Sequence, residues 1–176
     1  MNHPTIALIG YRGAGKSTVA GRLAQRLGWD AVDADVEIER QAGKSIAAIF
    51  ADAGEEAFRD LEQAVVQELS ARARTVIALG GGAVRREANR AALARCGAVV
   101  WLRTSVATIL ERLAGDPTTA QRRPPLTSAG PRQEIEQLLA ERTPMYQACA
   151  TLEVDTEGKS PGAIADEIAA ALGLGS

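Results

Sequence analysis

Residues 10–17 combine glycines, a lysine and a serine in a spacing that suits phosphate binding. They read "GYRGAGKS" and match the pattern Gly-x-x-x-x-Gly-Lys-Ser. Glycines allow backbone N–H groups to turn toward an anion, and the N-terminus of a following helix adds partial positive charge. In such a loop the lysine reaches the outer phosphates of a nucleotide, and the hydroxyl is a ligand of Mg²⁺. We therefore expect nucleotide contacts from Gly13, Ala14, Gly15, Lys16, Ser17 and Thr18, and a metal contact from Ser17.

An acidic pair, Asp33 and Asp35, follows a short apolar stretch that can form a strand. Ligands of α/β proteins bind beyond the carboxyl ends of parallel strands, so these carboxylates are candidates for a site. Because the two carboxylates are two residues apart, they can have different functions. The alternative is that Asp35 caps a helix over residues 36–41, which is a common use of aspartate. Position alone leaves both interpretations open.

Arginine and glutamate are spaced to form a pair on one helix. Arg59 precedes Glu62 by three residues, and Glu62 lies on an apolar stripe. A carboxylate on such a stripe needs a partner, and a guanidinium held by it is oriented to bind a substrate carboxylate through two hydrogen bonds. The alternative is a plain ion pair within the helix. Arg142 falls seven residues after Ile135 on the apolar stripe of its own helix, so it should point toward the protein body.

The elements that must position these residues alternate between strand and helix patterns, which is typical of βαβ units. The predicted strands are residues 5–9, 75–79, 98–102 and 151–154, with 31–35 a weaker fifth. Helical spacing follows in Val19-Leu23-Leu27, in Val106-Ile109-Leu110-Leu113, in Ile135-Leu138-Leu139 and in Ile164-Ile168-Leu172. The sequence therefore predicts an α/β fold with parallel strands.

Two regions depart from this alternation. Between Asp35 and Arg74 the pattern is helical throughout, with a break at "ADAG", and we expect an insert of helices over about 34–73. Within it Ser45 suits a helix N-cap. Residues 114–131, "AGDPTTAQRRPPLTSAGP", are rich in Pro, Gly, Ser and Thr, and we expect an exposed, mobile loop there.

Length and composition bound the possible functions. The chain has 176 residues, so we expect a single domain over 1–176. Its net charge of −2 gives no field that would hold a nucleic acid or an anionic membrane, and its apolar runs are far shorter than the roughly 20 residues of a membrane span. We expect a cytoplasmic monomer. Cys96 and Cys149 should be buried free thiols, and a single histidine, His3, nearly removes histidine-based catalysis.

Among phosphate-loop proteins, the sequence favours a small kinase. A GTPase should carry an Asn-Lys-x-Asp motif, which does not occur in the sequence. A motor or helicase needs a larger body. What remains is an enzyme that transfers a phosphoryl group to a small molecule, with its acceptor site in the helical insert and the loop.

Further motifs, in order along the chain, resemble those of the shikimate kinase family. They are "VDADVEIERQAGKSIAAIF", "GEEAFRDLE", "LGGGAV", an Arg-Pro pair in the loop, "ERTPMY" and "VDT". The resemblance covers nearly the whole chain. It implies a P-loop kinase fold in three layers, with a five-stranded parallel sheet flanked by helices, a helical substrate-binding insert and a lid over about 114–130. It also implies ATP-dependent phosphorylation of the 3-hydroxyl of shikimate on the route to aromatic amino acids.

The resemblance also implies roles for individual residues. Asp33 serves the Mg²⁺ shell through water, whereas Asp35 binds the acceptor hydroxyls and takes or orients the proton. Arg59 and Arg142 bind the substrate carboxylate, with Gly81 and Gly82 of a glycine triplet nearby; taken alone, a glycine triplet often marks only a turn. Ile46, Phe50 and Phe58 line the pocket. For the adenine end the resemblance points to Arg112, which could equally be a solvated helix residue, and to Lys159, Ser160 and Pro161.

The loop differs from the commonest family pattern, Arg-Pro-Leu-Leu, and reads Arg122-Arg123-Pro124-Pro125-Leu126. A proline restricts the residue before it to extended conformations, so Pro124 should aim Arg123 reproducibly. An arginine brought in by a closing loop stabilises the negative charge of phosphoryl transfer. We therefore expect Arg123 to contact the phosphates and Arg122 to be solvated.

Three other functions compete with this prediction. A kinase of another small acid such as gluconate could use the same loop and arginines, although Asp33 and Asp35 with "GGG" argue against it. A nucleoside monophosphate kinase must hold an acceptor base, yet aromatic residues are only 3% of the chain. A regulatory protein that had lost catalysis should show a damaged motif, whereas Lys16, Ser17 and both aspartates are present.

Overall fold

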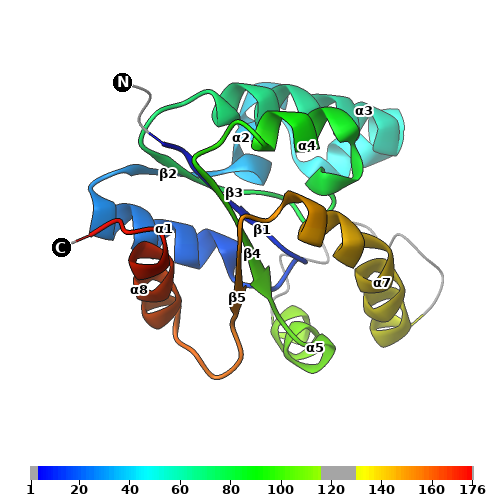
Figure 1. Ribbon diagram of the computed structural model, residues 1–176. Helices are drawn as coiled ribbons and strands as arrows, with labels where there is room; N and C mark the ends of the chain where they lie inside the picture. The colour runs from blue at the N-terminus through cyan, green and yellow to red at the C-terminus, as the bar shows by residue number, and fades with distance from the viewer. Residues whose placement is uncertain (1–3, 116–129, 176) are drawn as a thin grey trace.

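A parallel sheet forms the centre of the molecule. The computed structural model describes residues 4–115 and 130–175. The sheet has five strands in the order β2-β3-β1-β4-β5, and all neighbouring pairs are parallel (Figure 1). The strands are β1 (Ile6–Ile9), β2 (Asp30–Asp33), β3 (Thr75–Ala78), β4 (Ala98–Arg103) and β5 (Leu152–Asp155). Each prediction is confirmed to within about two residues, but the weak strand ends at Asp33 because Ala34 and Asp35 begin a helix.

Helices cover both faces of the sheet. They are α1 (Lys16–Leu27), α2 (Ala34–Ala42), α3 (Ile46–Ser70), α4 (Glu87–Leu93), α5 (Val106–Ala114), α7 (Pro131–Cys149) and α8 (Pro161–Ala171), with a short 3-10 helix η1 (Ala83–Arg85). Helices α1 and α8 lie on one face, and α2, α3 and α4 lie on the other (Figure 1). The five-stranded parallel sheet flanked by helices is therefore confirmed.

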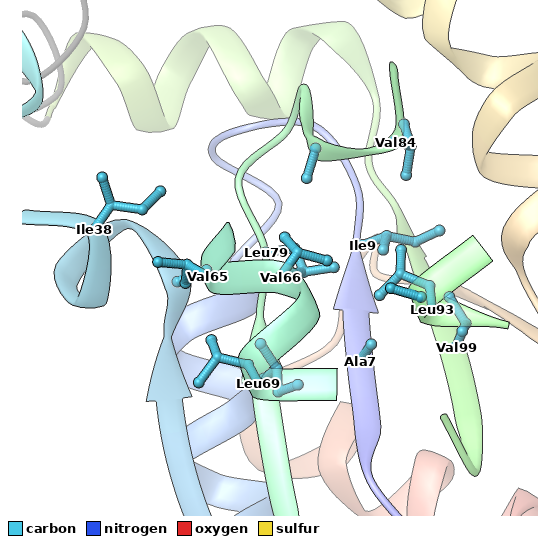
Figure 2. Close-up of a cluster of buried hydrophobic side chains, with 14 of the residues drawn as sticks. Ala7, Ile9, Ile38, Val65, Val66, Leu69, Leu79, Val84, Leu93 and Val99 are labelled. Atoms are coloured by element: carbon cyan, nitrogen blue, oxygen red, sulfur yellow. The ribbon is translucent and has the colours of Figure 1, made fainter. Parts of the chain in front are cut away.

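Side chains that alternate in direction along the strands contribute to two apolar cores, one on each face of the sheet. In β1, Ile6 and Leu8 pack with α1 and α8, whereas Ala7 and Ile9 pack with the helices of the opposite face. Figure 2 shows the second group, in which Val66 and Leu69 of α3 face the sheet. Because side chains alternate along a strand and both faces are covered, the inner strands β1, β3 and β4 are almost entirely buried, whereas the edge strands β2 and β5 carry polar residues.

The insert consists of helices only, as predicted. Helix α2 spans Ala34–Ala42 and α3 spans Ile46–Ser70, with the hydroxyl of Ser45 accepting a hydrogen bond from the Ala48 N–H as the N-cap of α3. The predicted break falls at Gly54, whose φ of 83° and ψ of 177° are not helical. Helix α3 is therefore two helical segments joined at a glycine, and the second segment carries Arg59.

Both cysteines are free, but they are half-buried rather than buried. Cys96 lies in the connection between α4 and β4, and Cys149 is the last residue of α7, so each sits at the margin of the core. Partial burial raises the pKa of both thiols above the ordinary value.

Among residues 4–115 and 130–175, the helices are all too short or too polar to cross a bilayer.

Candidate active site

The phosphate loop connects β1 to α1, as its sequence predicts. Lys16 is buried, and its Nζ donates hydrogen bonds to the carbonyl oxygens of Gly10 at 2.5 Å and Tyr11 at 2.9 Å. Gly13 and Gly15 have φ angles of 82° and 89°, in the left-handed region that favours glycine. The loop thus curls around its own lysine at the N-terminus of α1, an arrangement that binds phosphates.

Arg112 of α5 contacts this loop. Its Nη1 donates a hydrogen bond of 2.8 Å to the carbonyl oxygen of Gly13. Arg112 is nevertheless an exposed residue of its helix, so its contact with a nucleotide stays a prediction. The other candidates for the adenine end are at the start of α8. Lys159 Nζ pairs with Glu167 at 2.8 Å, while the Ser160 hydroxyl accepts a hydrogen bond from the Ala163 N–H and caps α8. A nucleotide contact by Lys159 stays a prediction.

Asp33 carries out two tasks with its two oxygens. One oxygen accepts a hydrogen bond from the Ser17 hydroxyl, while the other accepts the N–H groups of Asp35 at 2.8 Å and Val36 at 3.2 Å. Asp33 is therefore the N-cap of α2, and the interpretation of Asp35 as that cap is wrong. Asp35 instead lies in the first turn of α2 and is half-buried.

The contact between Ser17 and Asp33 brings together the two residues predicted to serve a metal. A hydroxyl and a carboxylate are hard oxygen donors of the kind that Mg²⁺ prefers, and Mg²⁺ commonly takes one or two carboxylates together with substrate phosphates. Within the described part of the chain there is no group of three or more His, Cys, Asp or Glu side chains that could hold a metal alone. The donor set thus fits Mg²⁺ bound jointly with a nucleotide.

Arg59 is held by an acid in the protein interior. The exposed fractions of Arg59 and Glu62 are 5% and 1%, and Arg59 Nη1 donates a hydrogen bond of 2.8 Å to Glu62 Oε1. The guanidinium also lies over the Phe58 ring, 5.2 Å from its centroid. The predicted pair is therefore formed, and it fixes the orientation of Arg59.

Arg142 is equally buried but lacks an acidic partner within the described residues. Its exposed fraction is 3%, and its Nε and Nη2 atoms have no hydrogen-bond partner there. The guanidinium lies 5.7 Å from the centroid of the Tyr11 ring. Burial lowers the pKa of Arg142 below the ordinary value, Tyr146 and Tyr11 counteract this, and the nearby charges of Arg59 and Arg85 lower the pKa further. A buried cation in this position favours the approach of an anion.

The glycine triplet lies directly against both guanidinium groups. A Cβ atom on Gly82 would lie 2.6 Å from Arg59 Nη2, and one on Gly81 would lie 3.4 Å from Arg142 Nη1. The Tyr146 hydroxyl, one turn after Arg142 on α7, donates a hydrogen bond of 2.6 Å to the Gly81 carbonyl. Side chains larger than hydrogen would therefore fill the space where the two arginines converge.

The three predicted pocket-lining residues are mostly core. Ile46 and Phe58 are fully buried, whereas Phe50 is half-buried and packs on Phe58 with ring centroids 5.0 Å apart. Of these three, only Phe50 has an exposed part of its side chain, and a contact of any of them with a substrate stays a prediction.

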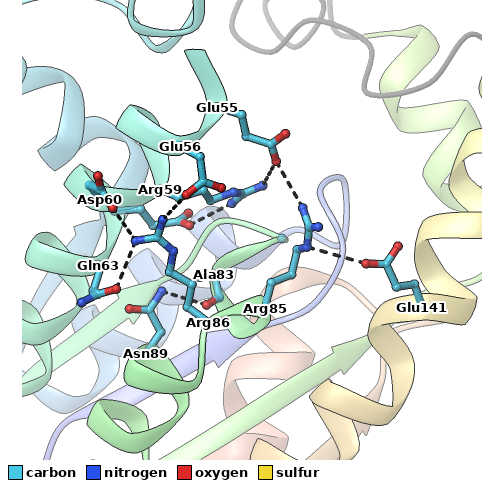
Figure 3. A network of polar contacts seen from close by, with 12 residues as sticks. Glu55, Glu56, Arg59, Asp60, Gln63, Ala83, Arg85, Arg86, Asn89 and Glu141 are labelled. Carbon is cyan, nitrogen blue, oxygen red and sulfur yellow. Dashed lines mark hydrogen bonds and ion pairs between the residues drawn. The ribbon is translucent and has the colours of Figure 1, made fainter. Parts of the chain in front are cut away.

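Sequence reasoning missed the polar network around η1 (Figure 3). Arg85 reaches Glu55 of α3 at 3.2 Å and Glu141 of α7 at 3.6 Å, so it joins the two helices that carry Arg59 and Arg142. Glu55 also lies 3.5 Å from Arg59 Nη2. Neighbouring Arg85 and Arg86 lie in a short turn without helical periodicity, and the sequence holds no signal that separates their roles.

Sequence reasoning also gave no role to Tyr11, the first variable residue of the phosphate loop.

The predicted catalytic Arg123, like its neighbour Arg122, lies outside the described residues.

A phosphate loop between β1 and α1, with an acidic pair and two buried arginines beside it, defines the class of P-loop kinases that act on small acids. The model of the shikimate kinase family matches residues 12–173, and the chain belongs to that family.

Individual relatives agree with this assignment. The shikimate kinase of Rhodopirellula baltica is 48% identical over 161 residues, covering 92% of this chain and 86% of the relative. The solved shikimate kinase from Acinetobacter baumannii, in complex with shikimate, has a TM-score of 0.90 and 38% identity over 97% of this chain and 94% of that chain. A gluconokinase from Sinorhizobium meliloti has a TM-score of 0.61 at 17% identity, covering 98% of this chain and 94% of that chain, which shows a shared fold alone.

Proposed function

We propose that this chain transfers the γ-phosphoryl group of ATP to the 3-hydroxyl of shikimate, giving ADP and shikimate 3-phosphate on the route to chorismate and aromatic amino acids. One observation carries the proposal: Arg142 is buried without an acidic partner among the described residues, beside Arg59 and the glycine triplet. An organic carboxylate of a small substrate supplies the missing negative charge. The structural relative solved with shikimate supports the identity of that acid.

The nucleotide binds at the loop of residues 10–17. Backbone N–H groups of Gly13, Ala14 and Gly15 and the start of α1 hold the phosphates, and Lys16 exchanges its carbonyl partners for phosphate oxygens. Ser17 and Thr18, at the start of α1, also contact the nucleotide phosphates. Ser17 and, through water, Asp33 would hold Mg²⁺, which would neutralise charge on the phosphates.

Asp35 acts on the acceptor. It lies in the first turn of α2, two residues after Asp33, which accepts hydrogen bonds from the Ser17 hydroxyl and from the Asp35 N–H. The 3-hydroxyl oxygen forms a bond to the γ-phosphorus while the bond from that phosphorus to the bridging oxygen of ADP breaks. The hydroxyl proton passes to Asp35, whose carboxylate also orients the hydroxyl.

The substrate carboxylate binds between Arg59 and Arg142, and the Gly81–Gly82 backbone lets the ring approach closely. Glu62 keeps Arg59 in place through the bond of 2.8 Å. Arg59 belongs to α3 of the insert and Arg142 belongs to α7. A bound substrate carboxylate therefore links these two helices.

The remaining contacts are assigned by family resemblance. Arg112, whose side chain contacts the phosphate loop, and Lys159 serve the nucleotide, and Arg123 serves the transferring phosphoryl group. We propose that the enzyme is a monomer that works in the cytosol, where ATP is available, with neither nucleic acid nor membrane as a partner.

The experiment is a coupled assay of ADP release with ATP and Mg²⁺ over a panel of acceptors. Shikimate should give turnover, whereas gluconate and nucleoside monophosphates should not. Turnover on gluconate comparable to that on shikimate contradicts the proposed substrate. Omission of Mg²⁺ with excess chelator should abolish turnover in the same assay.

A further inference from the structure

The two arginines at the glycine triplet are held by different means. Arg59 has the carboxylate of Glu62 at 2.8 Å and the Phe58 ring beneath it. Arg142 has the Tyr11 ring at 5.7 Å and no hydrogen-bond partner for Nε or Nη2 among the described residues. Arg142 is therefore supported by an aromatic ring, whereas Arg59 is supported by both a ring and a carboxylate.

The acids near Arg142 are engaged with other arginines. Glu141, its neighbour on α7, lies 3.6 Å from Arg85. Glu134 of the same helix lies 3.5 Å from Arg12, which follows Tyr11 in the phosphate loop. Among the described residues the local pairing of charges thus leaves Arg142 unneutralised, while the ring of Tyr11 lies beside it.

We infer that Tyr11 is a positioning residue for substrate binding, whose ring face holds the Arg142 guanidinium toward the glycine triplet without neutralising it. This inference rests on the proposed function, since the anion that Arg142 awaits is the carboxylate of shikimate. A ring presents partial negative charge on its face and attracts a cation within about 6 Å of its centroid.

An aromatic support suits this position better than a carboxylate. An acid at 2.8 Å, like Glu62 beside Arg59, would satisfy the guanidinium and compete with the substrate carboxylate for the same N–H groups. A ring stabilises the cation while leaving those N–H groups available. Because Tyr11 also belongs to the phosphate loop, its backbone carbonyl accepts from Lys16 Nζ, and one residue contacts both halves of the site.

The competing explanation is simple packing. Tyr11 is 2% exposed and packs with Ile109 of α5 and with Ile135 and Leu138 of α7. Packing and ring-face attraction make different demands on the side chain. Phenylalanine keeps the ring, whereas leucine keeps an apolar side chain and loses the ring face.

The test compares Tyr11→Phe with Tyr11→Leu, with Tyr11→Met as a second ringless variant in case the leucine variant folds poorly. We expect the phenylalanine variant to keep the wild-type KM for shikimate. The ringless variants should raise that KM about 3- to 30-fold. Their kcat and their KM for ATP should stay within about twofold of wild type, because the backbone of the loop is unchanged. In an Arg142→Ala background, the ringless substitution should add nothing to the KM for shikimate.

Crystal structures of the ligand-free variants give a readout that needs no turnover. Arg142 should keep its place in Tyr11→Phe and take another position in Tyr11→Leu. An unmoved Arg142 in the leucine variant, or equal KM values for the leucine and phenylalanine variants, overturns the inference. So does a rise in KM for ATP as large as that for shikimate. Absence of shikimate turnover by the wild-type enzyme contradicts the proposed function instead, and the crystal structures still decide the role of Tyr11.

Discussion

At the scale of single residues, the site separates charge that is already paired from charge that awaits a ligand. Glu62 fixes Arg59, and Asp33 is engaged by Ser17 and by the N–H groups of α2. Arg142 has no acidic partner in the described part of the chain. We expect the paired groups to set the geometry of the site and Arg142 to attract the substrate.

Replacement of Asp35 tests the proton step. Asp35→Asn keeps the size of the side chain but removes the charge that accepts a proton, so kcat should fall by about 10² to 10⁴ while KM for ATP changes little. Steady-state kinetics with varied ATP and shikimate measure both. Because Asp33 is the cap of α2, the variant should also keep wild-type stability. A near-normal kcat would show that Asp35 takes no proton.

Removal of Glu62 tests whether the orientation of Arg59 matters. Glu62→Gln leaves Arg59 in place but replaces a charged hydrogen-bond partner by a neutral one, so kcat/KM for shikimate should fall by a factor equivalent to about 1–2 kcal/mol. Glu68→Gln is the matched control, because Glu68 is an exposed residue of the same helix that pairs with Arg72. Equal effects from both variants would argue against a role for Glu62 in binding.

The loop arginines, which lie outside the described residues, are compared side by side. Because a proline disfavours helical conformations of the residue before it, we expect Arg123 to be the arginine that reaches the phosphates, so Arg123→Ala should lower kcat by about 10³ or more and Arg122→Ala should change it little. Rapid-quench measurement of the chemical step decides the ranking. The reverse order would move the catalytic role to Arg122, and two small effects would make the loop a cover that excludes water.

At the scale of elements, the insert depends on two backbone features: the Asp33 cap of α2 and the glycine break in α3. Gly54 has φ 83° and ψ 177°, a conformation that is open essentially to glycine alone. The break sets the direction of the second segment of α3, on which Arg59 and Glu62 lie one turn apart.

Gly54→Ala should therefore destabilise the protein by about 1–3 kcal/mol. Gly21→Ala is the control, because Gly21 lies inside α1 and should gain about 0.5–1 kcal/mol. A Cβ atom at either position meets nothing within 4 Å, so the two variants differ in backbone conformation and not in space. Denaturant unfolding measures both free energies. Equal values for the two variants would mean that α3 straightens without cost.

The elements were predicted well and the contacts between them less well. The strands, the Ser45 cap of α3 and the break at Gly54 follow from local residue chemistry, such as serine before a helix and glycine at a positive φ angle. The pairing of Arg59 with Glu62 was predicted because both lie on one helix. The contacts of Tyr11 with Arg142 and of Arg85 with Glu141 join segments far apart in the chain, and a single sequence carries no register for them. Asp35 was given a possible cap role because a helix start is uncertain by a residue or two.

At the scale of the whole molecule, the site lies where neighbouring strands end. The phosphate loop follows β1, Asp33 ends β2 and the glycine triplet follows β3, and these strands are adjacent in the sheet. The apolar cores on the two faces fix this edge. A buried cation without a partner costs stability, so we expect Arg142, which is unpaired among the described residues, to lower the folding free energy in exchange for substrate binding.

Arg142→Met tests this balance. Methionine fills much of the same space without charge, so the free energy of unfolding of the ligand-free protein should rise by about 1 kcal/mol or more. Shikimate at 100 times its Kd should stabilise the wild type by about 2.7 kcal/mol and the variant hardly at all. Thermal unfolding with and without shikimate measures both effects. A destabilised variant that shikimate still stabilises would contradict the account.

We expect Asp33 to couple the binding of the two substrates. One of its oxygens faces the nucleotide side through Ser17, and the other holds the first turn of α2, where Asp35 awaits the acceptor. A carboxylate shared in this way links occupancy of one half of the site to order in the other. Linkage is reciprocal, so if ATP tightens shikimate binding by some factor, shikimate must tighten ATP binding by the same factor. Asparagine, itself a good helix cap, would keep the helix and break the link.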